Sequence, residues 1–119
     1  ILNEKPFLNI NSEKTIARHE VLVNIEQIIK ISKKLLKNNG ILALTHIPER
    51  LFEIFELMKK YNIEPKKIRF VYPKINKNSN IVLIEGVKNG KGGLKIMPPL
   101  FVHGKDGSYS KEIKEMFRW

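Results

Sequence analysis

The feature that most constrains the fold is an amphipathic segment that leads directly into a short apolar one. Apolar side chains recur at i, i+3 and i+4 spacing in residues 24–40, NIEQIIKISKKLLKNNG, which predicts a helix. Asn24 is expected to cap its start, and Asn39 and Gly40 to end it in a left-handed turn. Residues 41–46, ILALTH, are almost all apolar, as in a strand buried on both faces. This order favours an α/β fold with a parallel sheet.

Further along the chain, the sequence predicts a second helix and a pair of strands. The helix is expected over residues 47–62, with Pro48 tolerated in its first turn. Its apolar stripe is expected to consist of Leu51, Phe52, Phe55, Met58 and Tyr61. Residues 66–73 and 81–87 are predicted strands, and only a polar turn separates them. Because that turn is too short to hold a helix, the two strands are expected to pair antiparallel.

Both ends of the chain have weaker patterns. Residues 1–20 show no clean period and are predicted to be a loop. Residues 94–103 are expected to be extended at a sheet edge, because Pro98 and Pro99 cannot donate to a ladder. Ser110 is expected to cap a last short helix. The chain begins at Ile1 rather than at a methionine and is expected to be a piece of a longer protein.

Composition and charge limit the classes of function. Lys and Arg total 22 against 12 Asp and Glu, which gives a net charge of +10 and favours a polyanionic partner such as nucleic acid. The frequent Lys, Ile and Asn are also what a genome rich in A and T produces, so charge alone leaves the partner open. The absence of cysteine excludes disulfides, thiolate catalysis and thiolate zinc sites. Without a signal peptide or a long apolar run, a cytoplasmic protein without membrane association is expected.

Several local patterns have ordinary structural interpretations. GVKNGKGG, residues 86–93, has the wrong spacing for a phosphate-binding loop, and no helix follows it, so a surface turn is expected. The three histidines are far apart in sequence, and no metal site is predicted. SEKTIARHE, residues 12–20, places basic and acidic side chains next to each other, but adjacent side chains in a loop do not point at one another, and a nucleophile would have to be brought within about 3 Å of its base. No catalytic residue is therefore assigned from chemistry alone.

Basic residues gather after the second helix and along the predicted strand that follows it. With Tyr61 and Tyr72 among them, they form either an RNA-facing surface or an ordinary solvated face, and the sequence leaves both interpretations open. The cluster consists of Lys59, Lys60, Lys66, Lys67, Arg69, Lys74 and Lys77.

Six segments occur in an order found in one bacterial family. They are TIARHEV, a helix ending LLKNNG, then ILALTHIPERL, KKYNIEPKKIRFVYPK, NIVLIEGVKNGK and KIMPPLFVHGKDGSYS. From Ser12 onward, the chain resembles the C-terminal half of class I S-adenosylmethionine-dependent methyltransferases similar to the tRNA(Val) adenine-N6 methyltransferase. The resemblance implies a doubly wound, Rossmann-like sheet with an antiparallel strand pair at its edge. Residues 1–119 would form the C-terminal part of a single methyltransferase domain.

The resemblance also implies that the cofactor-binding half of the domain is absent. The family's glycine-rich turn, its ribose-binding acid and its Asn-Pro-Pro-Tyr motif do not occur here. The pair Pro98 and Pro99 is not that motif, because Met97 precedes it and Leu100 follows it. S-adenosylmethionine is expected for the full-length parent, whereas this fragment is expected to be inactive, with no catalytic, cofactor-binding or metal-binding residue. Arg18 and His19 would lie beside the substrate mouth. We expect them to order the Asn-Pro-Pro-Tyr loop of the parent or to contact RNA phosphate. Lys66, Lys67, Arg69 and Lys74 are expected to contribute to the same RNA-binding surface.

The partners implied are tRNA, the missing N-terminal half of the domain and a second copy of the chain. The parent would methylate the N6 amino group of an adenine in tRNA. Two alternatives stay open at the level of sequence. The chain could be a non-catalytic RNA-binding α/β module, or the parent could be a class I methyltransferase for a protein or small molecule, because one fold serves many substrates.

Overall fold

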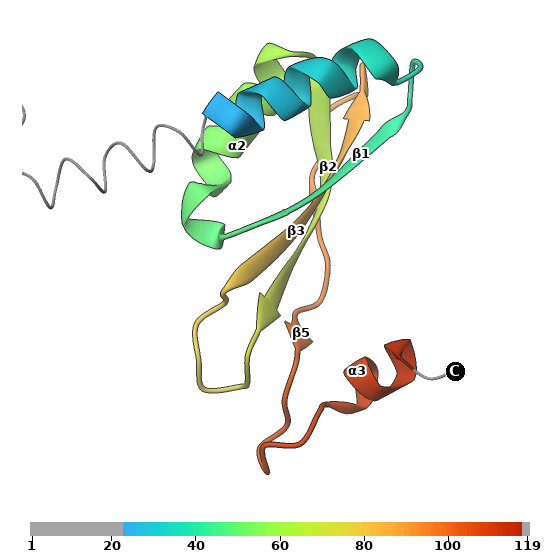
Figure 1. The fold of residues 1–119 in the computed structure, drawn as a ribbon. Helices are drawn as coiled ribbons and strands as arrows, with labels where there is room; N and C mark the ends of the chain where they lie inside the picture. Colours follow the sequence, from blue (N-terminus) through green and yellow to red (C-terminus); the bar gives the residue numbers. More distant parts are fainter. Residues whose placement is uncertain (1–22, 118–119) are drawn as a thin grey trace, which may run out of the picture.

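The structure is a computed structural model, and it describes residues 23–117. The predicted loop at residues 1–20, with Arg18 and His19, lies outside the described residues. Within the described part, a five-stranded sheet carries helices on one face and continues into a C-terminal segment beyond its lower end (Figure 1). The α/β class predicted from the sequence is confirmed.

The three long strands are β1 (Ile41–His46), β2 (Ile63–Tyr72) and β3 (Ile81–Lys88). β3 lies between the other two and is antiparallel to both, so β1 and β2 run in the same direction. The chain can return in parallel for β2 because α2 (Leu51–Lys60) provides the crossover. The turn from β2 to β3 is too short for a crossover, so β3 returns antiparallel. The predicted antiparallel pair is confirmed, and its second strand is inserted within the sheet.

The outer edge of β2 pairs with two short strands, β4 (Lys95–Ile96) and β5 (Leu100–Phe101). Both run parallel to β2, with Ile96 opposite Ile68 and Leu100 opposite Val71. Pro98 and Pro99 lie between them and interrupt the ladder, because proline has no backbone N–H to donate. The extended edge segment predicted from the two prolines is confirmed.

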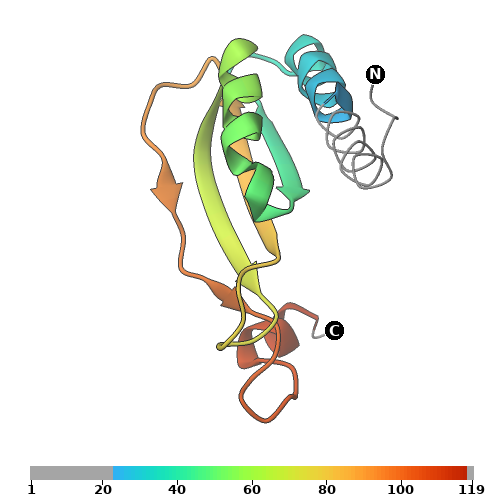
Figure 2. The same ribbon diagram turned by 90° about the vertical axis from the view of Figure 1, so that its left-hand side faces the viewer.

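One face of the sheet is covered by two helices. One helix covers residues 23–35, and the other is α2, which follows a 3₁₀ turn, η1 (Pro48–Arg50). Figure 2 shows α2 lying along the strands with the helix at 23–35 beside it. The buried core between helices and sheet consists of Ile25, Ile29, Ile54, Met58, Ile63, Ile68, Val82 and Ile84.

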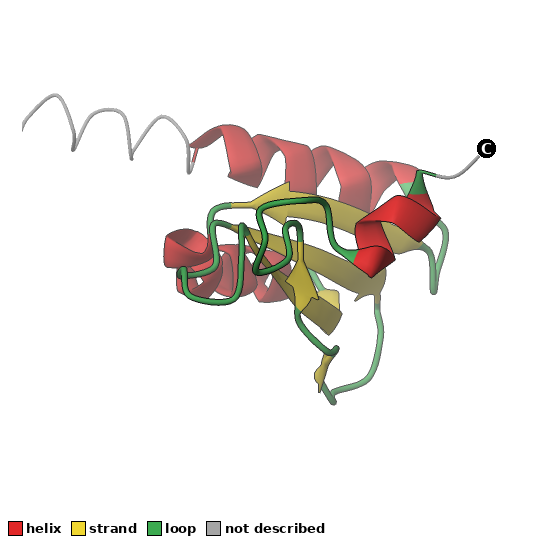
Figure 3. Cartoon of the chain, turned by 90° about the horizontal axis from the view of Figure 1, so that it is seen from below, coloured by secondary structure: helices red, strands yellow, loops and turns green. Residues whose placement is uncertain are grey.

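The last element, α3 (Lys111–Met116), lies beyond the carboxyl end of β2. The Ser110 side chain accepts a hydrogen bond from the backbone N–H of Ile113 at 3.3 Å, so the predicted cap is confirmed. Figure 3 looks at the molecule from this end and shows α3 and the surrounding loops in front of the strands.

Two expectations about the first helix and strand are corrected. Residues 23 and 24 are already helical, so Asn24 lies inside the helix and does not cap it. β1 is not buried on both faces, because its residues alternate between exposed and half-buried. It lies at one end of the strand order, and only its helix-facing residues pack against the core. Asn39 is left-handed as predicted, with φ of 67°, but the helix ends earlier, at residue 35, and Gly40 is not left-handed.

The apolar stripe predicted for α2 is confirmed at Leu51, Phe55, Met58 and Tyr61, which belong to the core or pack against it, and is wrong at Phe52. Phe52 is 84% exposed, whereas Ile54, which was not in the stripe, is fully buried with Met58. A stripe of Ile54, Met58 and Tyr61 keeps helical spacing, with Leu51, Phe55 and Leu57 at its borders. Hydrophobicity alone did not fix the phase, because apolar residues occur on almost every side of this helix.

Candidate functional site

The carboxyl ends of β1 and β2 lie at the edge where open α/β sheets bind their ligands. β1 ends at His46, whose Nδ1 lies 3.4 Å from the backbone oxygen of Ile47. Beyond β2 lie the turn at 73–80 and the chain at 97–117, which together we call the C-terminal lobe (Figure 1). The lobe therefore occupies the position where a substrate of such a fold would approach.

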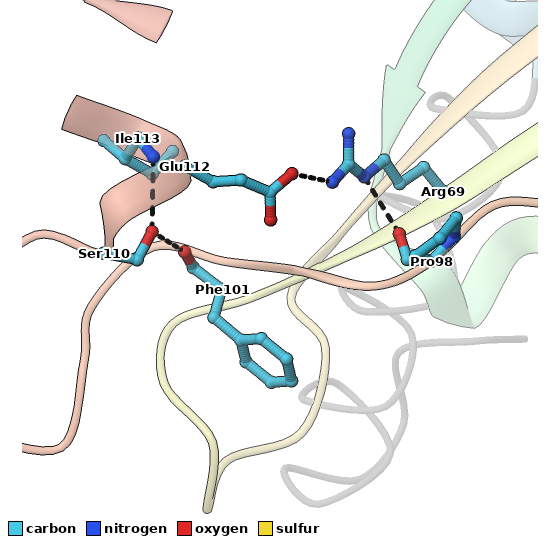
Figure 4. Close-up of polar contacts among 6 residues, drawn as sticks. All are labelled: Arg69, Pro98, Phe101, Ser110, Glu112 and Ile113. Atoms are coloured by element: carbon cyan, nitrogen blue, oxygen red, sulfur yellow. Dashed lines mark hydrogen bonds and ion pairs between the residues drawn. The ribbon is translucent and has the colours of Figure 1, made fainter. Parts of the chain in front are cut away.

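Arg69 holds the lobe against β2. Its Nε donates to the backbone oxygen of Pro98 at 2.9 Å, and its Nη2 donates to a carboxylate oxygen of Glu112 (Figure 4). Because Pro98 lies between β4 and β5 and Glu112 belongs to α3, one side chain joins three elements. Its side chain is only 23% exposed. Arg69 thus has a structural role in this chain, and its charge is already paired.

Backbone hydrogen bonds fix the loop at 102–110 beside the turn at 73–80. The N–H groups of Val102 and His103 donate to the backbone oxygens of Tyr72 and Pro73, each at 2.9 Å. Ser110 N–H closes the loop by donating to Val102 at 2.8 Å. Segments about thirty residues apart in sequence are thereby joined at one end of the sheet.

Asp106 organises the tip of this loop. Its carboxylate accepts hydrogen bonds from the Ser108 hydroxyl at 2.7 Å and from the Ser108 backbone N–H at 3.0 Å. These bonds, the hydroxyl first, lower the pKa of Asp106 below its ordinary value. The one acidic side chain within residues 102–110 is thus held in a local turn.

Aromatic rings and lysines meet in the lobe. Tyr72 stacks on Phe101 with ring centres 5.3 Å apart, and His103 stacks on Tyr109 at 4.9 Å. A hollow of about 570 Å³ lies between the turn and the loop, and it is lined by Pro73, Lys74, Lys77, Asn78, His103 and Gly107. A hollow with lysines and a histidine on its wall is suited to an anion.

The structure separates the four predicted contact residues that it describes. Lys66 donates to the backbone oxygens of Lys91 and Gly92, at 2.8 and 3.3 Å, and so supports a surface turn. Lys67 is exposed on the sheet face away from the helices, and Lys74 lies in the lobe. Lys66, Lys67, Arg69 and Lys74 do not form one continuous site, because Lys66 is tied to the turn at 91–92, Arg69 is paired, and Lys74 lies beyond the end of β2.

The lobe also contains residues that sequence reasoning did not assign to a site. Lys77 and His103 were noticed only as members of a basic run and of a scattered histidine set, and Tyr109 was not singled out. The available signal was the short turn-forming stretch HGKDGSYS between two extended residues and a capped helix. Pairing of this stretch with residues 72–73 is long-range information that local pattern does not contain.

A second polar cluster lies at the opposite end of the molecule. Glu26 accepts hydrogen bonds from Lys60 and from the Tyr61 hydroxyl, both at 2.7 Å. The Lys60 bond, followed by that of Tyr61, lowers the pKa of Glu26, and the bonds to Glu26 raise the pKa of Lys60 and of Tyr61. The cluster ties the helix at 23–35 to the end of α2, which is a structural role.

Within residues 23–117, no three His, Asp or Glu side chains converge as metal ligands. None of the helices in that range is long and apolar enough to cross a membrane.

A comparison with solved structures relates the fold to one methyltransferase. The chain is similar to the crystal structure of a predicted O-methyltransferase, protein Atu636 from Agrobacterium tumefaciens, with a TM-score of 0.71 at 17% sequence identity. The match covers 77% of this chain but only 44% of that protein, so the chain corresponds to less than half of its length. No protein-family model and no curated protein matches the sequence. At this identity the likeness establishes the fold, and the chain has the α/β fold of part of that O-methyltransferase.

Proposed function

We propose that this chain is the C-terminal half of the catalytic domain of a class I S-adenosylmethionine-dependent methyltransferase. The observation that carries the proposal is the strand order, in which antiparallel β3 lies between parallel β1 and β2 and α2 forms the crossover. The resemblance of the sequence motifs implies this arrangement independently, and the likeness to an O-methyltransferase supports it.

The described residues do not fit a cradle for S-adenosylmethionine. In such a cradle, a glycine-rich turn after a strand lets the backbone approach the cofactor. Here the turn after β1 reads His46, Ile47 and Pro48, and the Gly86 site is filled by Met58 and Ile63. No step of methyl transfer is therefore assigned to these residues. This half supplies three long strands, a helical layer and the C-terminal lobe.

We further propose that the parent methylates the N6 amino group of an adenine in tRNA. The motifs from TIARHEV to HGKDGSYS support this substrate, as does the net charge of +10. The lysines and stacked rings of the lobe, at the ligand-binding edge of the sheet, add a suitable surface. Arg18 and His19 are proposed to lie beside the substrate mouth of the parent enzyme.

Methyl transfer by the full-length protein tests the function. The protein is incubated with tRNA and S-adenosylmethionine labelled on its methyl group, and the RNA is digested to nucleosides. Label is expected in N6-methyladenosine, and a variant with Arg18→Ala is expected to transfer more slowly or to bind tRNA more weakly. Tight tRNA binding without any transfer would support the non-catalytic RNA-binding alternative and contradict the enzyme.

The structural neighbour motivates one competing reaction. Because that protein is described as a predicted O-methyltransferase, methylation of an oxygen is the second candidate. Label recovered in a ribose 2′-O-methyl group, or in a protein or small molecule, would replace the N6 assignment while keeping the methyltransferase. The nucleoside digest distinguishes the two RNA products, and incubation with protein or small-molecule fractions in place of tRNA detects the other products.

A further inference from the structure

The C-terminal lobe holds two neighbouring hollows joined by a pair of stacked rings. The first is the basic hollow of about 570 Å³, and His103 is part of its wall. The second, of about 520 Å³, is lined by Tyr109, Ile113, Lys114 and Phe117. The rings of His103 and Tyr109 are 4.9 Å apart and nearly parallel, so the two hollows meet at this stack.

The basic hollow has uncompensated positive charge. Lys74 and Lys77 are both exposed, and neither takes part in an ion pair with another residue of the 23–117 range. The nearby Asp106 is held by Ser108, and Glu112 is held by Arg69. Two ammonium groups and the Asn78 amide therefore line a concave surface with donors available for one anion.

His103 adds a ring whose hydrogen bonding is incomplete. Its Nδ1 is buried and has no hydrogen-bond partner among the described residues. The ring is held in place by stacking on Tyr109 and by the backbone hydrogen bond to Pro73. A buried polar atom without a partner is unfavourable, so the stack on Tyr109, and not a hydrogen bond of Nδ1, accounts for the position of this ring in the wall of the hollow.

The second hollow is apolar and aromatic. Tyr109 is 57% exposed and Phe117 is 67% exposed, although both are large hydrophobic side chains. An exposed ring already stacked on one side has a free face or edge for another flat ring. Base–aromatic stacking of this kind is how single-stranded nucleic acids are held without sequence readout.

We propose that the C-terminal lobe binds a short single-stranded segment of RNA, with a phosphate in the basic hollow and an adjacent base at Tyr109. This inference rests on the proposed function, in which RNA is the substrate, and it names the surface that receives the strand. A stacked His–Tyr pair between the two hollows places the phosphate and base sites next to each other, as in one nucleotide step. The lobe lies at the carboxyl ends of β1 and β2, so RNA bound there would lie at the edge of the sheet where α/β folds bind their ligands.

Charge reversal tests the phosphate site. Binding of a fluorescein-labelled 12-nucleotide RNA is measured for the full-length protein, with Lys74→Glu and Lys77→Glu introduced together. We expect affinity to fall about tenfold or more, because charge-assisted contacts are lost, and the slope of log affinity against log salt to fall by about 1. Lys34→Glu with Lys37→Glu is the matched control, because these exposed lysines have the same spacing and the same effect on net charge. Equal losses in the two double variants would overturn the proposal.

Removal of the ring tests the base site. Tyr109→Ala is expected to weaken RNA binding about 5-fold to 150-fold, which corresponds to the loss of one stacked base. Tyr109→Phe keeps the ring and is expected to bind nearly as the parent does. Circular dichroism checks that each variant is folded. Tyr109→Ala binding as tightly as Tyr109→Phe would remove the base site and with it the proposal.

Competition separates a strand from a free phosphate compound. Unlabelled 12-nucleotide RNA is expected to displace the probe at far lower concentration than inorganic phosphate or adenosine monophosphate. Displacement by adenosine monophosphate at equal concentration would instead identify a mononucleotide site and overturn the assignment to RNA. Methyl transfer by the same variants is measured in parallel. If the parent transfers methyl groups and the Lys74/Lys77 double variant binds RNA no more weakly than the control, only the lobe site is contradicted. Lobe-dependent RNA binding without transfer removes the proposed enzyme only.

Discussion

At the scale of single residues, Gly86 shows how closely the helices pack on the sheet. A Cβ atom added at this position would lie 2.2 Å from Met58 Cε and 2.7 Å from Ile63 Cγ2. Both neighbours are fully buried, and Ile63 is rigid because it is β-branched and lies in β2. Gly86 is therefore required by contact with the core. The sequence placed it both in the predicted strand 81–87 and in the surface turn expected at 86–93; the structure confirms the strand, since β3 extends to Lys88, and the turn is confined to residues 89–93.

Gly86→Ala is expected to destabilise the chain by about 1–3 kcal/mol, the usual cost of overpacking a core. Gly92→Ala is the matched control, because its Cβ would meet only a Glu64 carboxylate oxygen at 3.9 Å. That control is expected to stay within about 0.5 kcal/mol of the parent. Chemical denaturation of both variants measures the difference, and equal free energies of unfolding would contradict the contact.

Glu26 makes a pH-dependent contribution to the stability of the folded chain. Since Lys60 and Tyr61 lower the pKa of Glu26 below its ordinary 4.5, its stabilising effect is present above that pH and is lost as pH falls through the folded-state pKa. The pKa values of Lys60 and Tyr61 are raised, so their contribution is lost at high pH, above about 10. Glu26→Gln is thus expected to lower the unfolding temperature most between these limits.

Thermal unfolding across a pH series measures this effect. The difference between Glu26→Gln and the parent is expected to narrow below pH 4.5, where the Glu26 carboxylate of the parent becomes protonated. Glu56→Gln, at an exposed position of α2, serves as the control and is expected to show little difference at any pH. A gap of constant size from pH 3 to pH 8 would show that charge at Glu26 is unimportant.

At the scale of elements, local sequence pattern predicted which segments are helices and strands. Long-range pairing determined the order of the strands in the sheet and the assembly of the C-terminal lobe. The polar turn between β2 and β3 was sufficient to predict their antiparallel pairing. The predicted strand began at residue 66, whereas β2 begins at Ile63, and the structure accommodates Pro65 at an irregularity in pairing between Pro65 and Lys67. The lobe was not predicted as a unit, because Arg69 and Glu112, which join it, are 43 residues apart.

Arg69→Ala is expected to loosen the lobe while leaving the sheet intact. Loss of the contacts to Pro98 and Glu112 loosens α3 and Ser110 at its start, whereas Val102 and His103 keep their backbone hydrogen bonds to Tyr72 and Pro73. Hydrogen exchange is expected to become faster at the amides of Ser110 and Phe117, with little change at the amides of Ile84 and Leu44 in β3 and β1.

Lys67→Ala is the matched control for this element. Lys67 also lies on β2, but it is exposed and belongs to none of the ion pairs within the described residues. Its removal is expected to leave exchange in the lobe unchanged. Equal protection of α3 in Arg69→Ala and in the parent would show that β5 pairing alone holds the lobe.

At the scale of the whole molecule, helix packing covers one face of the sheet, and apolar groups remain on other surfaces. Ile41 is 58% exposed and Ile81 is 40% exposed on neighbouring strands, beside a shallow hollow lined in part by Ala43 and Leu83. β1 also has one edge without a partner strand in the described part of the chain. Unpaired edges and exposed apolar faces promote association. Burial of the core under the two helices thus explains the covered face. The open face and the free β1 edge are the surfaces that the proposed missing half of the domain would cover.

The 119-residue chain alone is therefore expected to self-associate as its concentration rises, through β1 and the open sheet face. Ile41→Lys places a charge on the β1 edge and is expected to shift the sedimentation profile toward monomer. Ile31→Lys is the matched control, since Ile31 is 55% exposed on the helix at 23–35 and thus carries the same substitution at nearly equal exposure. A monomeric parent at high concentration would contradict the expectation, whereas an equal effect of both variants would show that added charge, and not the β1 edge, controls the association.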